Sequence, residues 1–175
     1  MSRASTLSEK TLYSAAVFHH KQALVYSNEG KKELAFREFQ TAARSYGDYL
    51  ARFPHSKEAY ELTYYYGECL YNSGDFAGAA KAYTAVRDSN ADNRYTLEAA
   101  EAAVFALRNE MEVQQKSGKL ASRPVILSSQ RKDGEKVEPV ELPQAVKDYV
   151  DSIDVYLKLF PKCERAPTFA YNSGV

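Results

Sequence analysis

Apolar residues recur along this chain at steps of three and four positions, the spacing that places side chains on one face of an α-helix. The clearest stripe belongs to a helix predicted from about residue 32 to 52 and consists of Ala35, Phe39, Ala42, Tyr46, Tyr49 and Phe53. Pro54 predicts the end of that helix, because proline lacks a backbone N–H and disfavours helical geometry in the residue before it. The same periodicity in the other segments predicts an all-α protein.

The first predicted helix spans residues 9–27 and precedes this stripe. Ser8 is a candidate N-cap, and Gly30 is a candidate left-handed C-cap. The residues available for burial are Leu12, Ala16, Val17, Ala23 and Leu24. Together with residues 32–52, this helix predicts an antiparallel pair over residues 9–53.

A second pair is predicted over residues 56–88, with a tight turn at Asn72-Ser73-Gly74-Asp75. Apolar and small residues recur on both sides of that turn, as two facing amphipathic helices require. Gly67 and Ala79 lack bulk, so the two helices are predicted to approach closely at these positions.

A third pair is predicted over residues 93–160. Its first helix is alanine-rich and ends near residue 115, and Pro143 is placed to begin the second. Between them, residues 117–142 carry turn formers and charges around the short apolar run Val125-Ile126-Leu127. This insertion is either a surface loop with the apolar run tucked onto a helix or a binding element.

The chain also repeats part of itself. The segment from Tyr49 to Gly67 aligns with the segment from Tyr156 to Gly174, with Phe53-Pro54 matching Phe160-Pro161 at an offset of 107 positions. Self-similarity of this kind is typical of repeat architectures. Residues 164–175 therefore read as the start of a further repeat, and we expect the chain to be a segment of a longer array.

The spacing of Gly67, Leu70, Ala79 and Tyr83 resembles the tetratricopeptide repeat, although the tryptophan and closing proline of that consensus are Thr63 and Ala91 here. The resemblance implies a right-handed α-solenoid of about three antiparallel helix pairs, forming one domain over residues 1–175. The phrase Phe-Pro-x-Ser-x-x-Ala, from Phe53 to Ala59, is similar to envelope tetratricopeptide proteins of Gram-negative bacteria, of the outer-membrane assembly lipoprotein and Tol-Pal-associated types. It implies a periplasmic or outer-membrane-peripheral location, with the cytoplasm as the alternative.

Composition narrows the choice of partners. Lys and Arg together number 23, as do Asp and Glu, so the formal net charge is zero. This balance gives no indication of a nucleic-acid or anionic-membrane partner. No run of about 18 apolar residues occurs, so no membrane insertion is expected. The 14 tyrosines suit half-buried helix faces and wet binding surfaces.

Motifs of catalytic or cofactor chemistry are absent from the sequence. It contains no phosphate-binding glycine loop, no His-Glu-x-x-His and no Gly-x-Ser-x-Gly, and the spacing of Cys69 and Cys163 matches no metal motif. His19 and His20 are adjacent, so on a helix they project about 100° apart and cannot chelate one ion as a pair. We therefore expect no enzyme activity, no cofactor and no metal site.

A binding surface is the remaining expectation. The resemblance places the groove positions of the family at Glu61, Tyr64, Glu68, Tyr71 and Asn72, an aromatic and acidic set. Such a patch suits a protein partner that presents a peptide or helix with basic and apolar residues. The alternative is that the next repeat covers the patch.

The predicted function is a non-catalytic protein-interaction scaffold in a bacterial cell-envelope assembly. Two other hypotheses remain open: a structural array that self-associates as a homo-oligomer or spaces other domains, for example in a motility or secretion machinery, and a regulatory array of a larger enzyme.

Overall fold

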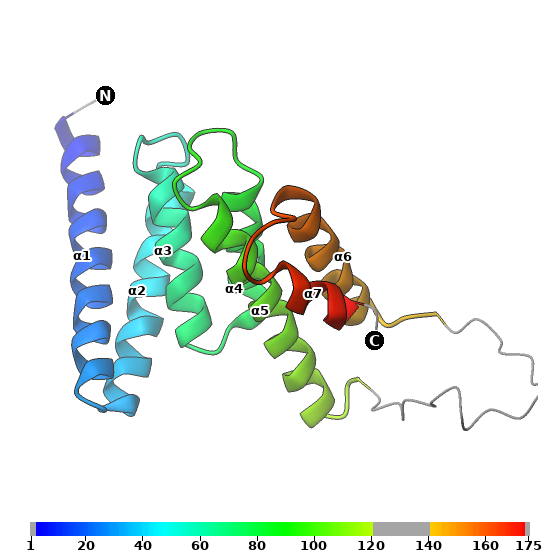
Figure 1. The fold of residues 1–175 in the computed structure, drawn as a ribbon. Helices are drawn as coiled ribbons and strands as arrows, with labels where there is room; N and C mark the ends of the chain where they lie inside the picture. Colours follow the sequence, from blue (N-terminus) through cyan, green and yellow to red (C-terminus); the bar gives the residue numbers. More distant parts are fainter. Residues whose placement is uncertain (1–2, 121–140, 174–175) are drawn as a thin grey trace, which may run out of the picture.

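The computed structural model describes residues 3–120 and 141–173. These residues form seven α-helices and no strand, so the all-α prediction is confirmed (Figure 1). The helices are α1 (Arg3–Asn28), α2 (Lys32–Arg52), α3 (Ala59–Asn72), α4 (Phe76–Arg87), α5 (Thr96–Lys116), α6 (Gln144–Leu159) and α7 (Ala166–Ser173).

Each helix packs mainly against its neighbours in the chain, from α1 against α2 to α6 against α7. The result is a row of helices with α1 at one end and α6 and α7 at the other (Figure 1). This arrangement is the one expected of stacked helix pairs, in which a unit contacts only adjacent units. The right-handed twist of the solenoid stays a prediction.

Short turns join the helices within the first two pairs. Gly30 and Gly74 have φ angles of 73° and 81°, in the left-handed region that glycine adopts without steric cost. Asp75 then begins α4 as its N-cap, because its side chain accepts a hydrogen bond of 2.8 Å from the backbone N–H of Gly78. Local turn chemistry therefore fixes where these helices stop and start.

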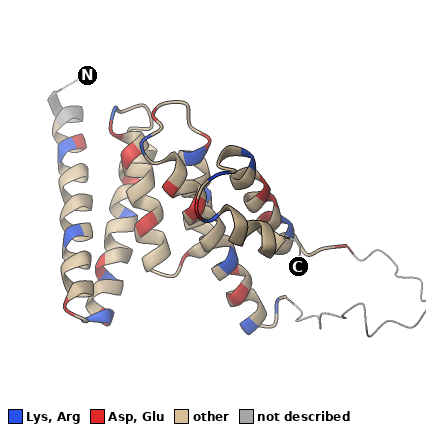
Figure 2. Cartoon of the chain, viewed as in Figure 1, with Lys and Arg blue, Asp and Glu red and all other residues tan. Residues whose placement is uncertain are grey.

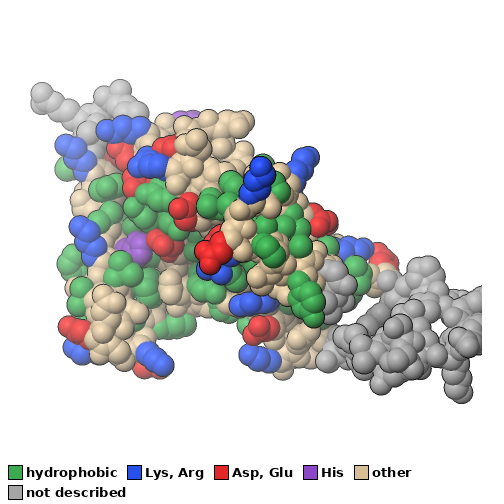
Figure 3. Space-filling model, in the orientation of Figure 1, with side chains coloured by type: hydrophobic (Ala, Val, Ile, Leu, Met, Phe, Trp, Pro, Cys, Tyr) green, Lys and Arg blue, Asp and Glu red, His purple; other side chains and the backbone are tan. Residues whose placement is uncertain are grey.

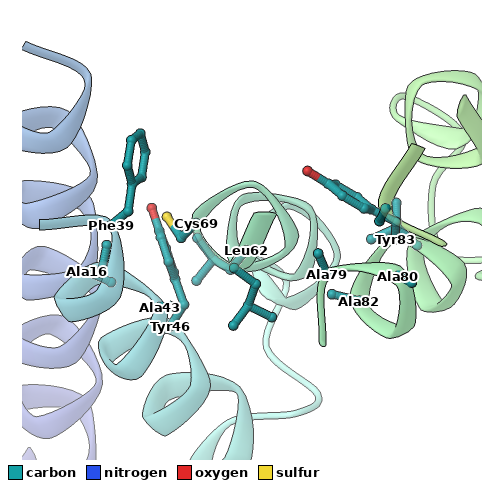
Figure 4. Close-up of a cluster of buried hydrophobic side chains, with 14 of the residues drawn as sticks. Ala16, Phe39, Ala43, Tyr46, Leu62, Cys69, Ala79, Ala80, Ala82 and Tyr83 are labelled. Carbon is teal, nitrogen blue, oxygen red and sulfur yellow. The ribbon is translucent and has the colours of Figure 1, made fainter. Parts of the chain in front are cut away.

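The core consists of two clusters of buried side chains. The larger draws on α1 to α5 and contains many alanines beside Phe39, Tyr46 and Tyr83 (Figure 4). The smaller joins α5, α6 and α7 around Ile153 and Tyr156. The small residues let helices approach closely, and the aromatic rings fill the space between them.

Gly67 of α3 packs directly against the ring of Tyr83 of α4. A Cβ atom at Gly67 would lie 2.8 Å from the Tyr83 ring, nearer than ordinary contact. The prediction that Gly67 is a packing position is thus confirmed. In α1, Ala16 and Ala23 are fully buried as predicted, whereas Leu24 is 48% exposed because it does not face the core formed with α2.

The two Phe-Pro turns have the same backbone geometry, which confirms this part of the internal repeat. Phe53 ends α2 with φ and ψ of −130° and 54°, and Phe160 ends α6 with −131° and 54°. Both phenylalanine N–H groups donate to the tyrosine carbonyl four residues earlier at 2.8 Å, from Tyr49 and Tyr156 respectively. The same short sequence therefore builds the same helix end twice.

Four helix starts differ from the predictions. α1 begins at Arg3, so Ser8 lies inside the helix instead of capping it, since residues 3–9 contain no glycine or proline to stop the helix. α3 begins at Ala59 instead of Ser56 because a turn closes from Ser56 N–H to the Phe53 carbonyl at 3.1 Å. Pro143 is the N-cap of α6, with an extended ψ of 147°, and α5 begins at Thr96.

The predicted insertion over residues 117–142 lies mostly outside the described residues. The structure describes it only at residues 117–120 and 141–142, and the apolar run from Val125 to Leu127 lies outside. Gly174, the predicted counterpart of Gly67, is also outside. None of the helices within residues 3–120 and 141–173 is long and apolar enough to cross a membrane.

Candidate functional site

Side chains from α1, α3, α4 and α5, together with Tyr95 just before α5, meet on one side of the helix row. We call this surface the α1–α3–α5 face. It consists of His20, Glu61, Tyr64, Tyr65, Glu68, Tyr71, Tyr83, Tyr95 and Asn109. Hydrophobic, acidic and histidine side chains occur together on the side of the molecule shown in Figure 3.

The structure brings four predicted site residues together along α3. Glu61, Tyr64, Glu68 and Tyr71 recur at steps of three and four, and each is only partly buried. Asn72 is exposed at the end of α3, where its side-chain amide donates a 2.8 Å hydrogen bond to the carbonyl of Glu68. Asn72 therefore closes the end of its own helix in this structure.

Glu61 is already occupied by hydroxyl groups. Its Oε1 atom accepts hydrogen bonds from the Tyr65 hydroxyl at 2.9 Å and from the Tyr95 hydroxyl at 3.1 Å. These bonds join α3 to the residue before α5, so Glu61 holds neighbouring units together. The Tyr65 hydroxyl also lies 3.3 Å from the Tyr95 hydroxyl, and this hydrogen bond, then burial, then the bond to Glu61 raise the pKa of Tyr65.

The tyrosines of the site contact the next unit as well as solvent. The Tyr64 ring stacks on Tyr95 with centroids 4.4 Å apart and planes at 8°, and burial raises the pKa of Tyr64 to about 12. The Tyr71 hydroxyl accepts a 2.8 Å hydrogen bond from the side chain of Asn109 on α5. The next repeat thus covers part of the patch, and both rings stay partly exposed.

Glu68 differs from Glu61 in having no hydrogen bond to its carboxylate within the described residues. Its nearest basic group is the ring of His20, whose Nε2 atom lies 4.0 Å from Oε2. Burial raises the pKa of Glu68 to about 6, and the Glu68 charge contributes to the raised pKa values of Tyr64 and Tyr83. Glu68 is thus a desolvated carboxylate among aromatic rings.

His20 completes the site from α1. It is 8% exposed, and its Nδ1 atom forms a 3.2 Å hydrogen bond with the Tyr46 hydroxyl. Its ring packs edge-on against Tyr46 and Tyr65, and burial lowers its pKa. His19 instead faces α2, where its Nδ1 atom lies 2.7 Å from Glu38, so the two histidines do point to different partners as their spacing predicts.

Sequence reasoning missed the other members of this face, which are His20, Tyr65, Tyr83, Tyr95 and Asn109. His20 lies almost 50 residues before Glu68 in the chain, and Tyr95 lies just before α5, outside any predicted apolar stripe. The run Tyr64-Tyr65-Tyr66 was the available signal, because three adjacent tyrosines cannot all point into one helix interface. Tyr66 lies toward α2 instead, beside Gly47.

Charged side chains are interspersed over the helices, as the balanced composition predicts (Figure 2). Within residues 3–120 and 141–173, no group of three or more His, Cys, Asp and Glu side chains is placed to hold a metal ion. Cys69 is buried, and burial raises its pKa, which is the reverse of what a reactive thiol requires. No protein-family model, curated protein or solved structure matches this chain.

Proposed function

We propose that this chain is a non-catalytic interaction scaffold that binds a peptide or helix of a partner protein across the α1–α3–α5 face. The observation that carries the proposal is the state of Glu68. Its carboxylate is desolvated, lacks a hydrogen bond within the described residues and is flanked by aromatic side chains. A basic side chain of a partner would neutralise this charge, and neighbouring apolar residues would pack on the tyrosines.

The two acidic residues of the face have different roles in this proposal. Oε1 of Glu61 accepts hydrogen bonds from two tyrosine hydroxyls, so this carboxylate helps to hold the surface together. Glu68 is the residue left for a ligand. Because Tyr64 and Tyr71 are held by Tyr95 and Asn109, the aromatic walls are ordered before the partner arrives, which lowers the entropic cost of binding.

A Glu68→Gln variant tests the proposal, because it removes the charge and keeps the shape. Peptides selected from a random display library against the whole chain should be enriched in Lys or Arg beside apolar residues. Their affinity, measured by calorimetry, should fall by about tenfold on Glu68→Gln, the loss expected for one charge-assisted contact. Glu33→Gln on α2 makes the same charge change away from this face and is the matched control.

Two results would overturn this proposal. One is enrichment of acidic peptides, and the other is equal affinity for the wild type and the Glu68→Gln variant. The resemblance of the Phe53–Ala59 segment to envelope tetratricopeptide proteins supports a place in a bacterial envelope assembly, at the periplasmic side of the outer membrane. Localisation of the full-length protein by cell fractionation tests that part separately.

A second candidate function, self-association, rests on a different surface. α1 exposes Leu7, Phe18 and Val25, at 69%, 62% and 46%, and their spacing places them on one face of the helix. An exposed apolar stripe of this kind favours contact with another chain. Light scattering across concentration tests it: growth of mass with concentration that Phe18→Ser abolishes would support a homo-oligomer, and a constant monomer mass would exclude one.

A further inference from the structure

The Phe-Pro turns after α2 and α6 each follow a buried tyrosine whose hydroxyl bonds a glutamate of another helix, but only the second turn adds an arginine to that glutamate. At the second turn, Glu101 accepts a 3.0 Å hydrogen bond from the Tyr156 hydroxyl at Oε1 and a 2.8 Å bond from Arg165 Nε at Oε2. The Arg165 guanidinium also lies 5.2 Å from the centre of the Phe105 ring. A guanidinium is therefore held here between a carboxylate and an aromatic face.

The first turn also has a glutamate and an aromatic ring beside its buried tyrosine. The Tyr49 hydroxyl donates a 3.1 Å hydrogen bond to Glu9 Oε1. Tyr13 follows Glu9 by one helical turn, as Phe105 follows Glu101, and its ring packs against Tyr49 with centroids 6.3 Å apart. Tyr49 and Tyr156 are both buried, at 1% and 0% exposure.

The guanidinium itself is missing at the first turn. At the offset of 107 positions that relates the two turns, Glu58 occupies the place of Arg165. Within the described residues, Glu9 Oε2 has neither a hydrogen bond nor an ion pair, whereas its counterpart on Glu101 binds Arg165. The first turn thus has the acceptors of the second turn and lacks its donor.

An open cavity of about 550 Å³ occupies this place. Its lining consists of Glu9, Lys10, Tyr13, Ser14, Tyr49, His55, Ser56, Lys57 and Glu58. Within the part of the chain that the structure describes, the Ser56 hydroxyl is buried and meets no hydrogen-bond partner at ordinary distance and angle, although its dipole acts on the pKa of the Tyr49 hydroxyl. Tyr13 is 40% exposed, so one side of its ring is accessible to a ligand. A buried polar group without a partner beside an unpaired carboxylate oxygen indicates a site that a polar cation can complete.

We propose that this cavity binds the guanidinium group of an arginine side chain from a partner protein. The chain's own Arg165 shows which group fits between such a carboxylate and such a ring. Arginine suits the site better than lysine because its planar fork can bond a carboxylate while stacking on an aromatic face. Glu58 adds a second carboxylate. Its ion pair with Lys57, whose Nζ atom lies 3.4 Å from Glu58 Oε1, involves a side chain that is 90% exposed, and such surface pairs contribute little free energy against a competing arginine.

This inference is independent of the α1–α3–α5 face, since none of the cavity residues belongs to it. The test titrates the whole chain with N-acetyl-L-arginine amide and follows backbone amide resonances by NMR. Saturable shifts are expected at Tyr13, Tyr49 and Ser56. The uncharged isostere N-acetyl-L-citrulline amide should produce none, and N-acetyl-L-lysine amide should bind more weakly.

Variants at the repeated position, Glu58 in the first turn and Arg165 in the second, test the site further. Glu58→Arg places an arginine where the second turn has Arg165, so it should fill the cavity from within and weaken binding of the arginine amide by at least about tenfold. Glu68→Gln should leave that binding unchanged, which separates this site from the α1–α3–α5 face. Arg165→Ala should create a second set of saturable shifts, near Phe105.

Three results would overturn the proposal: no saturable shift with the arginine amide, equal shifts with the citrulline amide, or unchanged binding to Glu58→Arg. The Glu58 side chain is partly exposed, at 29%, so its substitution is expected to leave the buried Tyr49 in place. The helical circular dichroism of Glu58→Arg, compared with that of the wild type, shows that a loss of binding does not come from a loss of folding.

Discussion

Replacing Gly67 with alanine tests how tightly α3 and α4 pack at this position. The same change at Gly47 measures the gain from helix propensity alone, so the difference in stability between the two variants measures the cost of packing. Both Gly47 and Gly67 lie inside helices, where alanine is favoured over glycine by about 1 kcal/mol. At Gly47 the new methyl group would lie 3.6 Å from the Tyr66 ring, an ordinary contact. Gly47→Ala should therefore raise the free energy of unfolding by about 1 kcal/mol.

At Gly67 the same methyl group meets a ring that cannot move aside. It would lie 2.8 Å and 2.9 Å from two atoms of Tyr83, which is 4% exposed. Tyr83 packs against Tyr64, which is itself stacked on Tyr95. Overpacking of this kind costs about 1–3 kcal/mol, so Gly67→Ala should be less stable than Gly47→Ala by that amount.

Urea unfolding followed by circular dichroism measures both variants, and thermal unfolding should show a difference of about 2–4 °C for each kcal/mol in a chain of this length. Tyr83→Leu provides the control, because a shorter side chain relieves the contact. In that background, Gly67→Ala should cost less than in the wild type. Equal stability of the Gly47→Ala and Gly67→Ala chains would falsify the assignment of Gly67 as a contact that excludes a side chain.

Two further predictions concern charge and capping. Because the pKa of Glu68 is about 6 in the folded chain and ordinarily 4.5, its contribution to stability is full below pH 4.5 and is lost as pH rises through 6. Glu68→Gln should therefore raise the free energy of unfolding by about 1 kcal/mol at pH 8, a figure reduced because about a third of the side chain is exposed. This gain should vanish by pH 4.5. A gain that urea titrations show to be independent of pH would contradict the prediction. Asp75→Ala should lower the free energy of unfolding by about 1 kcal/mol, because the N–H of Gly78 loses its acceptor, whereas Asp75→Asn should retain most of it; equal urea midpoints for the two variants would count against the cap.

The sequence predicts most of the fold because its signals are local. Apolar spacing, Gly30, Gly74 and the Phe-Pro turns each act within a few residues, so they indicate where helices run and end. The errors occurred where the local signal was ambiguous. Ser8 can cap a helix or continue one, and nothing between residues 3 and 9 decides against continuation.

The candidate site was only partly predictable, for a physical reason. Helical spacing places Glu61 and Glu68 on the same face of α3, but it does not say which groups from other helices reach them. Tyr95 comes from the next unit and donates a hydrogen bond to Glu61, while the ring of His20 lies 4.0 Å from the Glu68 carboxylate. Two residues that are equivalent in sequence terms therefore have different chemistry.

The sequence by itself determined most of the helices, most of their ends and the internal repeat of the Phe-Pro turn. These features depend on backbone geometry and residue spacing within one segment. Only the tertiary structure shows that each Phe-Pro turn lies beside a glutamate and an aromatic ring of another helix, and that an arginine binds this pair at the second turn. Arg165 reaches Glu101 and Phe105 across the fold, whereas within the described residues no arginine bonds Glu9 beside Tyr13. That difference arises from contacts between residues far apart in the chain, which a local pattern does not encode.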